Sequence, residues 1–480
     1  MEQQTVPHLL LIPFPALGHI SPMIKLAELL YQAGFHITFL NTPHNYDRHL
    51  RFTDLQSRFT SSPRFRFQTI SDGLPPDHPR SVQLIRDIFF STQLVTKPLL
   101  RDLLLSFPQD LPVTGIIADG IMTFAIDVAQ DLGIPIFIFR TCSACAFWAY
   151  RCIPKLIEAG DLPFEDHDDM DRPINSVPGM ETLLRRRDLP SICRMKDLEN
   201  PVFQFFVNET LNTARASGLI LNTFDDLEGP ILSHIGSHFP QLYSIGPIHT
   251  LLKTRQGDTP PSVASNGGLW EEGGNCLAWL ESKPFKSVLY VSFGSIVSVT
   301  RDELLELWYG LVNSGKPFLW VIRKDLIARK EGEEGEIPAE LEGGTKERGC
   351  VVGWAPQEEV LAHPAVGGFL THSGWNSTLE SIIAGVPMIC WPQLSDQPIN
   401  SRFVSEVWRN GIDMKDRCDR VTVEKMVRDL MVDQREELEK AADKMADLAR
   451  KCVREGGSSY CNFERLLEDI RSTMSFPQLS

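Results

Sequence analysis

Residues 354–397 carry the side chains that a protein needs in order to hold a nucleotide-sugar. The segment begins WAPQ, has THSGWNSTLE in its middle and ends LSDQ. An indole can stack on a base, carboxylates can accept hydrogen bonds from ribose and sugar hydroxyls, and amides, hydroxyls and an imidazole can donate to phosphate oxygens. These residue types, gathered in one short segment, predict a site for a nucleoside diphosphate that carries a sugar.

The middle of this segment predicts the start of a helix that can bind a diphosphate. At about 100° per residue, Asn376, Ser377 and Glu380 fall on one arc of that helix. Free backbone N–H groups and the helix dipole favour an anion at its start, where His372 adds a further donor. Glu380, one turn later, can accept two hydrogen bonds from a ribose diol. Taken alone, the helix can equally be an ordinary capped helix.

The two ends of the segment supply the remaining contacts. Trp354 comes shortly before Pro356, which stiffens the loop and presents the indole face to a base. Gln357 offers an amide that matches the edge of uracil, and Asp396 with Gln397 offers a carboxylate and an amide for vicinal hydroxyls. A lone tryptophan is usually a core residue, so the prediction depends on the combination.

Over its whole length this segment resembles the donor-binding signature of the plant family-1 UDP-glycosyltransferases, and the resemblance extends over the rest of the chain, including residues 291–295. It implies an α/β fold of two Rossmann-like, doubly wound domains that face a cleft, the arrangement called GT-B. It also implies these donor contacts: Trp354, Ala355 and Gln357 to uracil, Glu380 to ribose, His372, Asn376, Ser377 and Ser295 to the diphosphate, Trp375, Asp396 and Gln397 to the sugar, and Thr141 near the glucose 6-hydroxyl. A closing glutamine goes with glucose in this family, so Gln397 implies UDP-glucose as the donor, with no metal ion and no cofactor.

A second set of chemical residues lies in the first half of the chain. His19 sits in a loop after a predicted strand at residues 9–12, and Asp119 ends a predicted strand at residues 115–118. By the resemblance, His19 is the catalytic base and Asp119 the carboxylate that orients it, although Leu17 stands where many members have glutamine. A carboxylate on Nδ1–H fixes the tautomer and stabilises the imidazolium that forms. The alternative for Asp119 is a cap of the next turn.

These residues predict a single inverting displacement. Nε2 of neutral His19 takes the proton of an acceptor hydroxyl, the oxygen attacks the anomeric carbon, and UDP leaves, so that an α-linked donor gives a β-glucoside. Hydrogen-bond donors at the helix start stabilise the charge that grows on the diphosphate. A carboxylic acid acceptor, already ionised at neutral pH, needs little help from a base.

The acceptor is expected to bind against apolar walls from the first half of the chain. The candidates are Phe14, Ile121, Phe147, Trp148 and Met195, each of which can equally be a core residue. The chain especially resembles plant enzymes that glucosylate iridoid and related terpenoid acceptors, which implies a small lipophilic partner. That analogy does not identify the substrate.

Alternating strands and helices must position both sets of residues. Ser21 and Pro22 predict the N-cap and first residue of a helix that Gly34 ends. Further strands are predicted at residues 36–40, 135–139, 219–222, 288–293, 318–322, 351–352, 368–371 and 386–391, and helices at 124–132, 304–312 and 376–384. This alternation is typical of parallel sheets with crossover helices.

The domain organisation follows from a break in that pattern. Residues 250–274 are rich in glycine and proline and predict a linker. We expect an acceptor-binding domain at 1–249, a UDP-sugar-binding domain at 275–455, and a C-terminal helix and tail at 456–480 that pack back on the first domain. In open parallel sheets, ligands bind at the carboxyl ends of the strands.

Composition excludes several classes of function. The chain has 480 residues and a formal net charge of -15, so a nucleic-acid binder, which needs a basic surface, is not expected. No apolar run is long enough to span a membrane, and no secretory signal is evident, so we expect a cytoplasmic protein. We also expect it to be a monomer. Cys142 and Cys145 form a lone C-x-x-C pair, for which reduced thiols are favoured over a metal site.

Two classes of alternative remain. A non-catalytic protein could keep the nucleotide-sugar site, but the presence of both His19 and Asp119 argues against it. A nucleotide-sugar epimerase or a bacterial-type lipid glycosyltransferase could use the same architecture. The epimerase would have no acceptor pocket, and the lipid enzyme would need a basic or apolar membrane-facing patch, which this acidic chain does not show.

Overall fold

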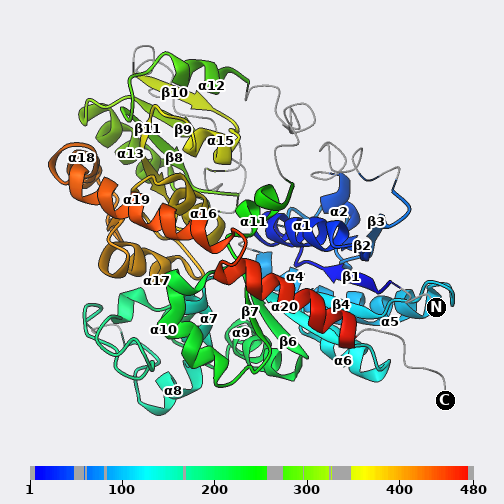
Figure 1. Cartoon of the computed structure of the whole chain (residues 1–480). Helices are drawn as coiled ribbons and strands as arrows, with labels where there is room; N and C mark the ends of the chain where they lie inside the picture. Colours follow the sequence, from blue (N-terminus) through cyan, green and yellow to red (C-terminus); the bar gives the residue numbers. More distant parts are fainter. Residues whose placement is uncertain are drawn as a thin grey trace. The chain divides into compact units, whose positions relative to one another are not determined.

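The computed structural model describes residues 6–47, 59, 62–80, 84–165, 169–256, 274–295, 297–323, 326 and 348–473. The chain divides into two compact units, each with its own sheet (Figure 1). The first comprises Met1–Pro154, Asp197–Leu269 and Lys451–Ser480, and the second comprises Lys155–Lys196 and Trp270–Arg450. Two α/β units with parallel sheets confirm the fold class predicted from the sequence.

Residues 155–196 belong to the second unit, whereas the sequence placed them in the first domain. In its described residues, 155–165 and 169–196, the helices are short: the end of α8 (Ile153–Glu158), η4 (Arg186–Asp188) and η5 (Ser191–Arg194). Ion pairs such as those of Asp188 with Lys415 and of Arg187 with Asp416 tie it to the second unit, and such pairs leave no pattern in the sequence. The expected limits of independently folding domains stay a prediction.

The first unit is built on a seven-stranded parallel sheet of order β3-β2-β1-β4-β5-β6-β7. Its strands are β1 (His8–Ile12), β2 (His36–Asn41), β3 (Phe65–Thr69), β4 (Gly115–Asp119), β5 (Ile136–Arg140), β6 (Gly218–Leu221) and β7 (Leu242–Ser244). The central strands β1 and β4 are buried on both faces, which explains their continuous apolar sequences. The edge strands β3 and β7 escaped prediction because one carries polar residues and the other is only three residues long.

Helices connect these strands. They are α1 (Leu17–Gln32), α2 (Pro43–Asn45), α4 (Ile85–Ser91), η3 (Thr92–Thr96), α5 (Lys97–Ser106), α6 (Phe124–Asp131), α7 (Ala144–Arg151), α9 (Pro201–Asn212), η6 (Thr213–Arg215), α10 (Asp225–Gly236), α11 (Ile248–Gln256) and α20 (Ser458–Thr473). Part of the expected linker at 250–274 is thus helical in α11, and 257–273 lie outside the described residues. α20 packs on β7, where the Tyr243 hydroxyl donates to Asp469 at 2.5 Å and the Arg465 guanidinium lies 4.5 Å from the Tyr243 ring centroid.

The predicted start of α1 was wrong. The helix begins at Leu17 with Ala16 as N-cap, so Pro22 lies inside the first two turns. Proline can be accommodated there because its fixed φ suits a helix and only one backbone hydrogen bond is lost. The predicted end was right, since Gly34 follows the helix with φ +100°. As a consequence, His19 belongs to the first turn of α1 instead of a preceding loop.

The second unit is built on a six-stranded parallel sheet of order β10-β9-β8-β11-β12-β13. Its strands are β8 (Val288–Ser292), β9 (Phe318–Val321), β10 (Gly349–Val352), β11 (Val366–Thr371), β12 (Met388–Cys390) and β13 (Gly411–Asp413). Its helices are α12 (Gly274–Glu281), α13 (Arg301–Asn313), α15 (Gln357–Leu361), α16 (Trp375–Ala384), α17 (Gln397–Arg402), η7 (Phe403–Val407), α18 (Arg420–Arg428), η8 (Asp429–Asp433) and α19 (Arg435–Cys452). β13 escaped prediction because it is a three-residue edge strand that follows a π-helical turn.

A large apolar core supports one face of this second sheet. Trp320 of β9 is fully buried and lies 6.5 Å from the Trp308 ring of α13. α13 begins with a reciprocal capping box between Thr300 and Glu303, which fixes its first turn. In the part of the chain that the structure describes, no helix is both long and apolar enough to cross a membrane.

Candidate functional site

In the first unit, His19 and Asp119 meet at the point where the strand order reverses. β1 has β2 on one side and β4 on the other, so the residues after β1 and β4 meet at the carboxyl edge of the sheet, where such folds bind ligands. The His19 Nδ1 atom lies 2.8 Å from Oδ2 of Asp119. The Asp119 side chain is 2% exposed and the His19 side chain 27%, so the imidazole can reach solvent while its partner cannot.

The Asp119 carboxylate is fixed by a second contact. Its Oδ1 atom accepts the backbone N–H of Ile121 at 3.1 Å, which leaves Oδ2 for the imidazole. The His19 N–H donates to the carbonyl of Ala16 at 2.9 Å, as expected for the first turn of a helix. A carboxylate accepts hydrogen bonds only, so Nδ1 must carry the proton and Nε2 is the atom that can take one.

Thr141 lies beside the same imidazole nitrogen. Its Oγ1 atom is 3.0 Å from Nδ1 of His19, directly after the end of β5. The family resemblance implied a place near the glucose 6-hydroxyl. The structure adds a second role, because a hydroxyl oxygen next to Asp119 gives the Nδ1–H group two acceptors.

Arg140 supports this corner of the sheet and was missed from the sequence. It ends β5 but is 5% exposed, and its Nη1 donates to the carbonyl of Gly120 at 2.7 Å. A Cβ atom at Gly120 would lie 1.9 Å from Cδ of Arg140, so only glycine fits there. A charged residue that closes the apolar strand IFIFR is the signal that marked this position.

The proposed apolar walls separate into two groups. The Phe14 ring lies edge-on to His19 at 5.2 Å, and Ile121 is bonded to Asp119, so both lie at the imidazole. Phe147 is fully buried, with its ring 5.7 Å from that of Phe239, while Trp148 stacks on His234 of α10 at 5.8 Å.

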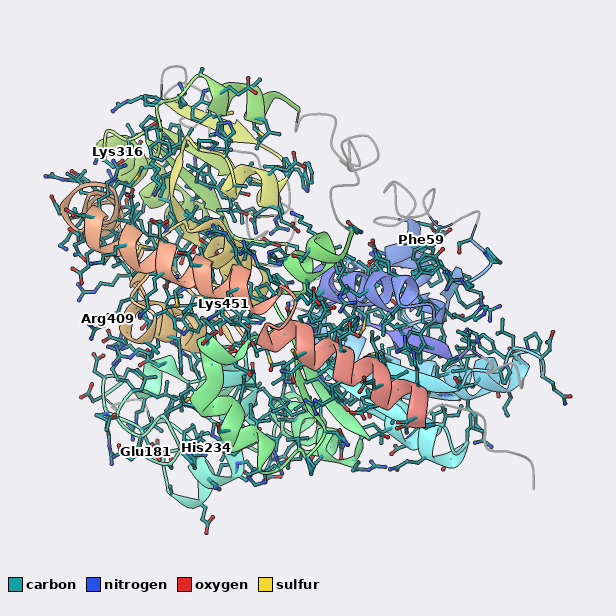
Figure 2. All side chains as sticks on the ribbon, viewed as in Figure 1. Phe59, Glu181, His234, Lys316, Arg409 and Lys451 are labelled. Carbon is teal, nitrogen blue, oxygen red and sulfur yellow. The ribbon has the colours of Figure 1, made fainter. Side chains whose placement is uncertain are left out.

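Figure 2 labels the second of these aromatic partners, His234, on α10. Met195 follows η5 in the second unit. Phe89 was missed: it packs 5.5 Å from the Phe14 ring.

In the second unit, His372 directly follows β11, the strand that lies next to β8 in the sheet. Burial, and then the positive charge of Arg323, lower the pKa of His372 to about 4, so the ring is neutral at physiological pH. Its Nδ1 atom is buried and has no hydrogen-bond partner among the described residues. A buried ring nitrogen beside a helix start can exchange a hydrogen bond with a polar ligand group.

Two glycines make room for the His372 ring. A Cβ atom at Gly294 would lie 2.6 Å from the ring, and one at Gly374 would lie 2.4 Å from it. Gly294 also has φ +69°, and Gly374 is the N-cap of α16 without a side-chain hydrogen bond to the helix start. Next to Gly294, Ser295 is half-buried, and its carbonyl accepts from Arg323 at 2.6 Å.

The predicted uracil and ribose residues also come together. Gln357 begins α15, and its Nε2 donates to Ser377 Oγ at 2.8 Å and to Glu380 Oε2 at 2.6 Å. Tyr290 of β8 donates to the Gln357 oxygen at 3.2 Å. These bonds join α15 to α16, with Trp354 half-buried on the loop that precedes α15. Ala355 on the same loop is buried.

The sugar-binding candidates lie at the start of α17. Asp396 is its N-cap, and the Gln397 side-chain oxygen accepts the backbone N–H groups of Gln393 and Leu394 at 2.8 and 2.9 Å. Asn400, which the sequence reading missed, donates to Asp396 at 2.9 Å and to the Ser373 carbonyl at 3.0 Å, and so links the loop to the start of α16.

Two other predicted residues differ in exposure. Trp375 is 3% exposed, with its ring 6.1 Å from that of Trp408, so the indole belongs to the core. Asn376 is half-buried at the start of α16. The predicted donor residues of the second unit therefore converge on one edge of the sheet, although the Trp375 indole packs inward.

Comparison with known proteins gives independent evidence on the family of the chain. The family described as UDP-glucoronosyl and UDP-glucosyl transferase matches residues 273–435. A 7-deoxyloganetic acid glucosyltransferase of Catharanthus roseus is 55% identical over 98% of both chains, and a mogroside I-A1 synthase of Siraitia grosvenorii is 47% identical over 98% of this chain and 90% of its own.

Solved structures agree as well. Os79 of O. sativa in complex with UDP has a TM-score of 0.80 at 27% identity, covering 98% of this chain and all of that one. UGT71G1 of Medicago truncatula, complexed with UDP-glucose, has a TM-score of 0.77 at 28% identity, over 97% and 98% of the two chains. A near-full-length match to a relative at 55% identity, together with the matching fold, shows that this chain belongs to the plant UDP-glycosyltransferase family and is an enzyme of that family.

Proposed function

We propose that the enzyme transfers glucose from UDP-glucose, with inversion, to a hydroxyl or carboxyl group of a small lipophilic metabolite, with His19 as general base. The observation that carries the proposal is the hydrogen bond between Nδ1 of His19 and the buried Asp119 carboxylate. It leaves Nε2 as the basic atom, and this is the arrangement that general base catalysis by a histidine requires.

The donor site supplies the other half of the mechanism. UDP leaves with a growing negative charge, which the backbone N–H groups at the start of α16 and the His372 ring stabilise. Trp354 and Gln357 hold uracil, Glu380 the ribose, and Asp396 with Gln397 the glucose. The transfer is proposed to need no metal ion, because hydrogen-bond donors at a helix start can take its place.

The reaction is a single displacement with balanced bonds. A hydroxyl oxygen forms a bond to the anomeric carbon, the bond from that carbon to the diphosphate oxygen breaks, and the acceptor proton moves to Nε2 of His19. The proton then returns to solvent, and UDP carries away the bonding electrons. The mechanism requires that the donor present its anomeric carbon to the acceptor oxygen at His19.

The acceptor class is proposed from the relatives. Two of them are named for 7-deoxyloganetic acid in Catharanthus roseus and 7-deoxyloganetin in Gardenia jasminoides, at 55% and 41% identity. We therefore propose an iridoid or related terpenoid acceptor, packed against Phe14 and Ile121 at the imidazole. A cytoplasmic monomer is proposed as the working form.

Incubation with UDP-glucose and a panel of aglycones tests the proposal. The expected result is a conjugate heavier by one hexose, with one UDP released for each conjugate formed, and a β-linkage by NMR. Release of UDP without a conjugate would indicate hydrolysis, and binding without UDP release would indicate a non-catalytic protein. Conversion of UDP-glucose into another UDP-hexose would indicate an epimerase. Any of these three results would contradict the proposal.

A further inference from the structure

The loop that carries Asp396 and Gln397 is bonded to a segment far away in the chain. The N–H of Ser395 donates to Oγ of Ser191 at 2.6 Å, and the N–H of Ser191 donates to the carbonyl of Ser395 at 2.9 Å, although the two serines are 204 positions apart. Ser395 has φ +58°, a left-handed backbone conformation that serine rarely adopts. The two hydrogen bonds therefore hold a strained backbone immediately before Asp396.

A second anchor lies on the other side of the same two residues. Nζ of Lys415 donates to the carbonyl of Pro398 at 2.8 Å, and it contacts Asp188 at 2.7 Å and Asp413 at 3.1 Å. These three contacts account for all three of its N–H groups. Asp188 is thus tied, through one lysine, to the residue that follows Gln397.

This second anchor is rigid because it is buried. The Asp188 side chain is fully buried and that of Lys415 is 8% exposed. Burial would raise the pKa of Asp188, but hydrogen bonds from Arg185 and the charge of Lys415 outweigh it, so the pKa is lowered and the carboxylate stays ionised. If one member of this group moved away, it would leave an unpaired buried charge, which is costly. The group is therefore held in one geometry.

The two anchors flank the residues that would contact the hexose. Ser395 comes directly before Asp396, and Pro398 directly after Gln397. UDP-glucose and UDP-galactose differ only in the orientation of one hydroxyl, and discrimination between them requires that polar groups be held in place, since a loosened loop can satisfy either epimer.

We propose that Asp188 and Ser191 clamp the Asp396–Gln397 pair, and that Ser191 is a positioning residue that sets the preference of the enzyme for glucose over its C4 epimer. The inference deepens the proposed function and rests on it. It assigns a specificity role to residues 188–191, which belong to the second unit although they lie in the first half of the sequence.

The test compares Ser191→Ala with the wild type. Loss of the hydroxyl removes the acceptor for the Ser395 N–H, so only one of the two hydrogen bonds between Ser191 and Ser395 remains. The ratio of kcat/KM for UDP-glucose to that for UDP-galactose is expected to fall roughly threefold to tenfold, the value of one ordinary hydrogen bond. The Kd for UDP should not change, because UDP has no hexose.

Two variants serve as matched controls. Ser191→Thr keeps the hydroxyl and should restore the wild-type ratio. Ser176 lies in the same segment, but its hydroxyl donates to Asp161 instead of contacting the Asp396–Gln397 loop. Ser176→Ala should therefore leave the ratio unchanged. An unchanged ratio in Ser191→Ala would overturn the clamp, and so would an equal loss of affinity for UDP.

A measurement on the wild type avoids any dependence on how the variant folds. Hydrogen exchange of peptides that cover residues 188–195 and 393–398 should slow more with UDP-glucose than with UDP alone. No difference between the two ligands would overturn the clamp. If the wild-type enzyme forms no hexose conjugate with any acceptor, the proposed function fails instead, so the two failures can be told apart.

Discussion

The Nδ1 atom of His19 lies 2.8 Å from Oδ2 of Asp119, although the two residues are 100 positions apart in the chain. The remaining carboxylate oxygen accepts the Ile121 N–H, so the orientation of Asp119 is set by the backbone as well as by the imidazole. This relationship fixes the protonation of the ring before any substrate binds. It is the structural basis for the predictions that concern the base.

Replacement of Asp119 by asparagine should be more harmful than replacement by alanine. The Ile121 N–H keeps the amide oxygen on its own side, so the amide NH₂ points at Nδ1 and donates to it. The proton is then forced onto Nε2, which can no longer act as a base. In Asp119→Asn, kcat should fall about 10²–10⁴-fold, with a smaller loss in Asp119→Ala, where the productive tautomer is still available. Steady-state kinetics at saturating UDP-glucose measure this, and an equal loss in both variants would contradict the tautomer argument.

Thr141→Val separates two roles for Thr141. If its hydroxyl mainly gives Nδ1–H of His19 a second acceptor, kcat should fall about twofold to tenfold with the KM for UDP-glucose unchanged. A rise in that KM at constant kcat would instead indicate a contact with the sugar. Thr141→Ser keeps the oxygen and should retain wild-type kinetics, and failure of this variant would point to packing of the methyl group.

Gly294→Ala should weaken the donor site through a clash. The new Cβ would lie 2.6 Å from the His372 ring and would also suffer strain from φ +69°. Gly315→Ala is a matched control, since Gly315 has φ +70° but its nearest neighbour for a Cβ lies 3.6 Å away. Both variants should lose about 1–2 kcal/mol of unfolding free energy from the backbone strain.

Only Gly294→Ala should lose affinity for UDP. The loss should be about tenfold or more, as expected when a side chain that hydrogen-bonds to phosphate is displaced. Isothermal titration calorimetry with UDP gives this comparison directly. Equal affinities in the two glycine variants would show that the His372 ring does not hold the diphosphate.

Stability should fall in mildly acidic solution because of His372. Its pKa is lowered to about 4 in the folded chain, mainly by burial, so between pH 6.5 and 4 the unfolded chain binds more protons than the folded chain. The contribution of this residue is therefore complete above the unfolded pKa and decreases as the pH falls. Between pH 7 and pH 5, the His372 contribution to the free energy of unfolding should fall by about 2 kcal/mol. Urea unfolding at both pH values measures the fall in the free energy of unfolding. That fall should be smaller by this amount in His372→Gln than in the wild type, and an identical fall in both would show that His372 does not stay neutral.

Much of the fold could be predicted from the sequence because buried parallel strands have continuous apolar runs. The strands β1, β4, β5 and β11 were all located within a residue or two. Short edge strands such as β13 were not, since three residues give no periodicity. The start of α1 was misplaced because Pro22 is typical of a first helical turn, yet here it lies within the helix.

The residues of the candidate site likewise divide into those that the sequence predicts and those that it does not. His19 and Asp119 follow strands of the first sheet and the donor candidates within 354–397 follow strands of the second, so their places at the carboxyl edge of each sheet followed from the topology. Asn400 and Ser191 could not be found, because their roles depend on hydrogen bonds to backbone atoms of Ser373 and Ser395. Contacts of this kind are made by common residue types and leave no motif.

The most direct test of the account is the turnover of His19→Ala with a hydroxyl acceptor. The account predicts a fall in kcat of about 10²–10⁴-fold, with the Kd for UDP-glucose unchanged, because the imidazole supplies general base catalysis and does not hold the donor. A carboxylic acid acceptor, already ionised, should lose far less. Wild-type turnover of the hydroxyl acceptor by His19→Ala would contradict the central claim.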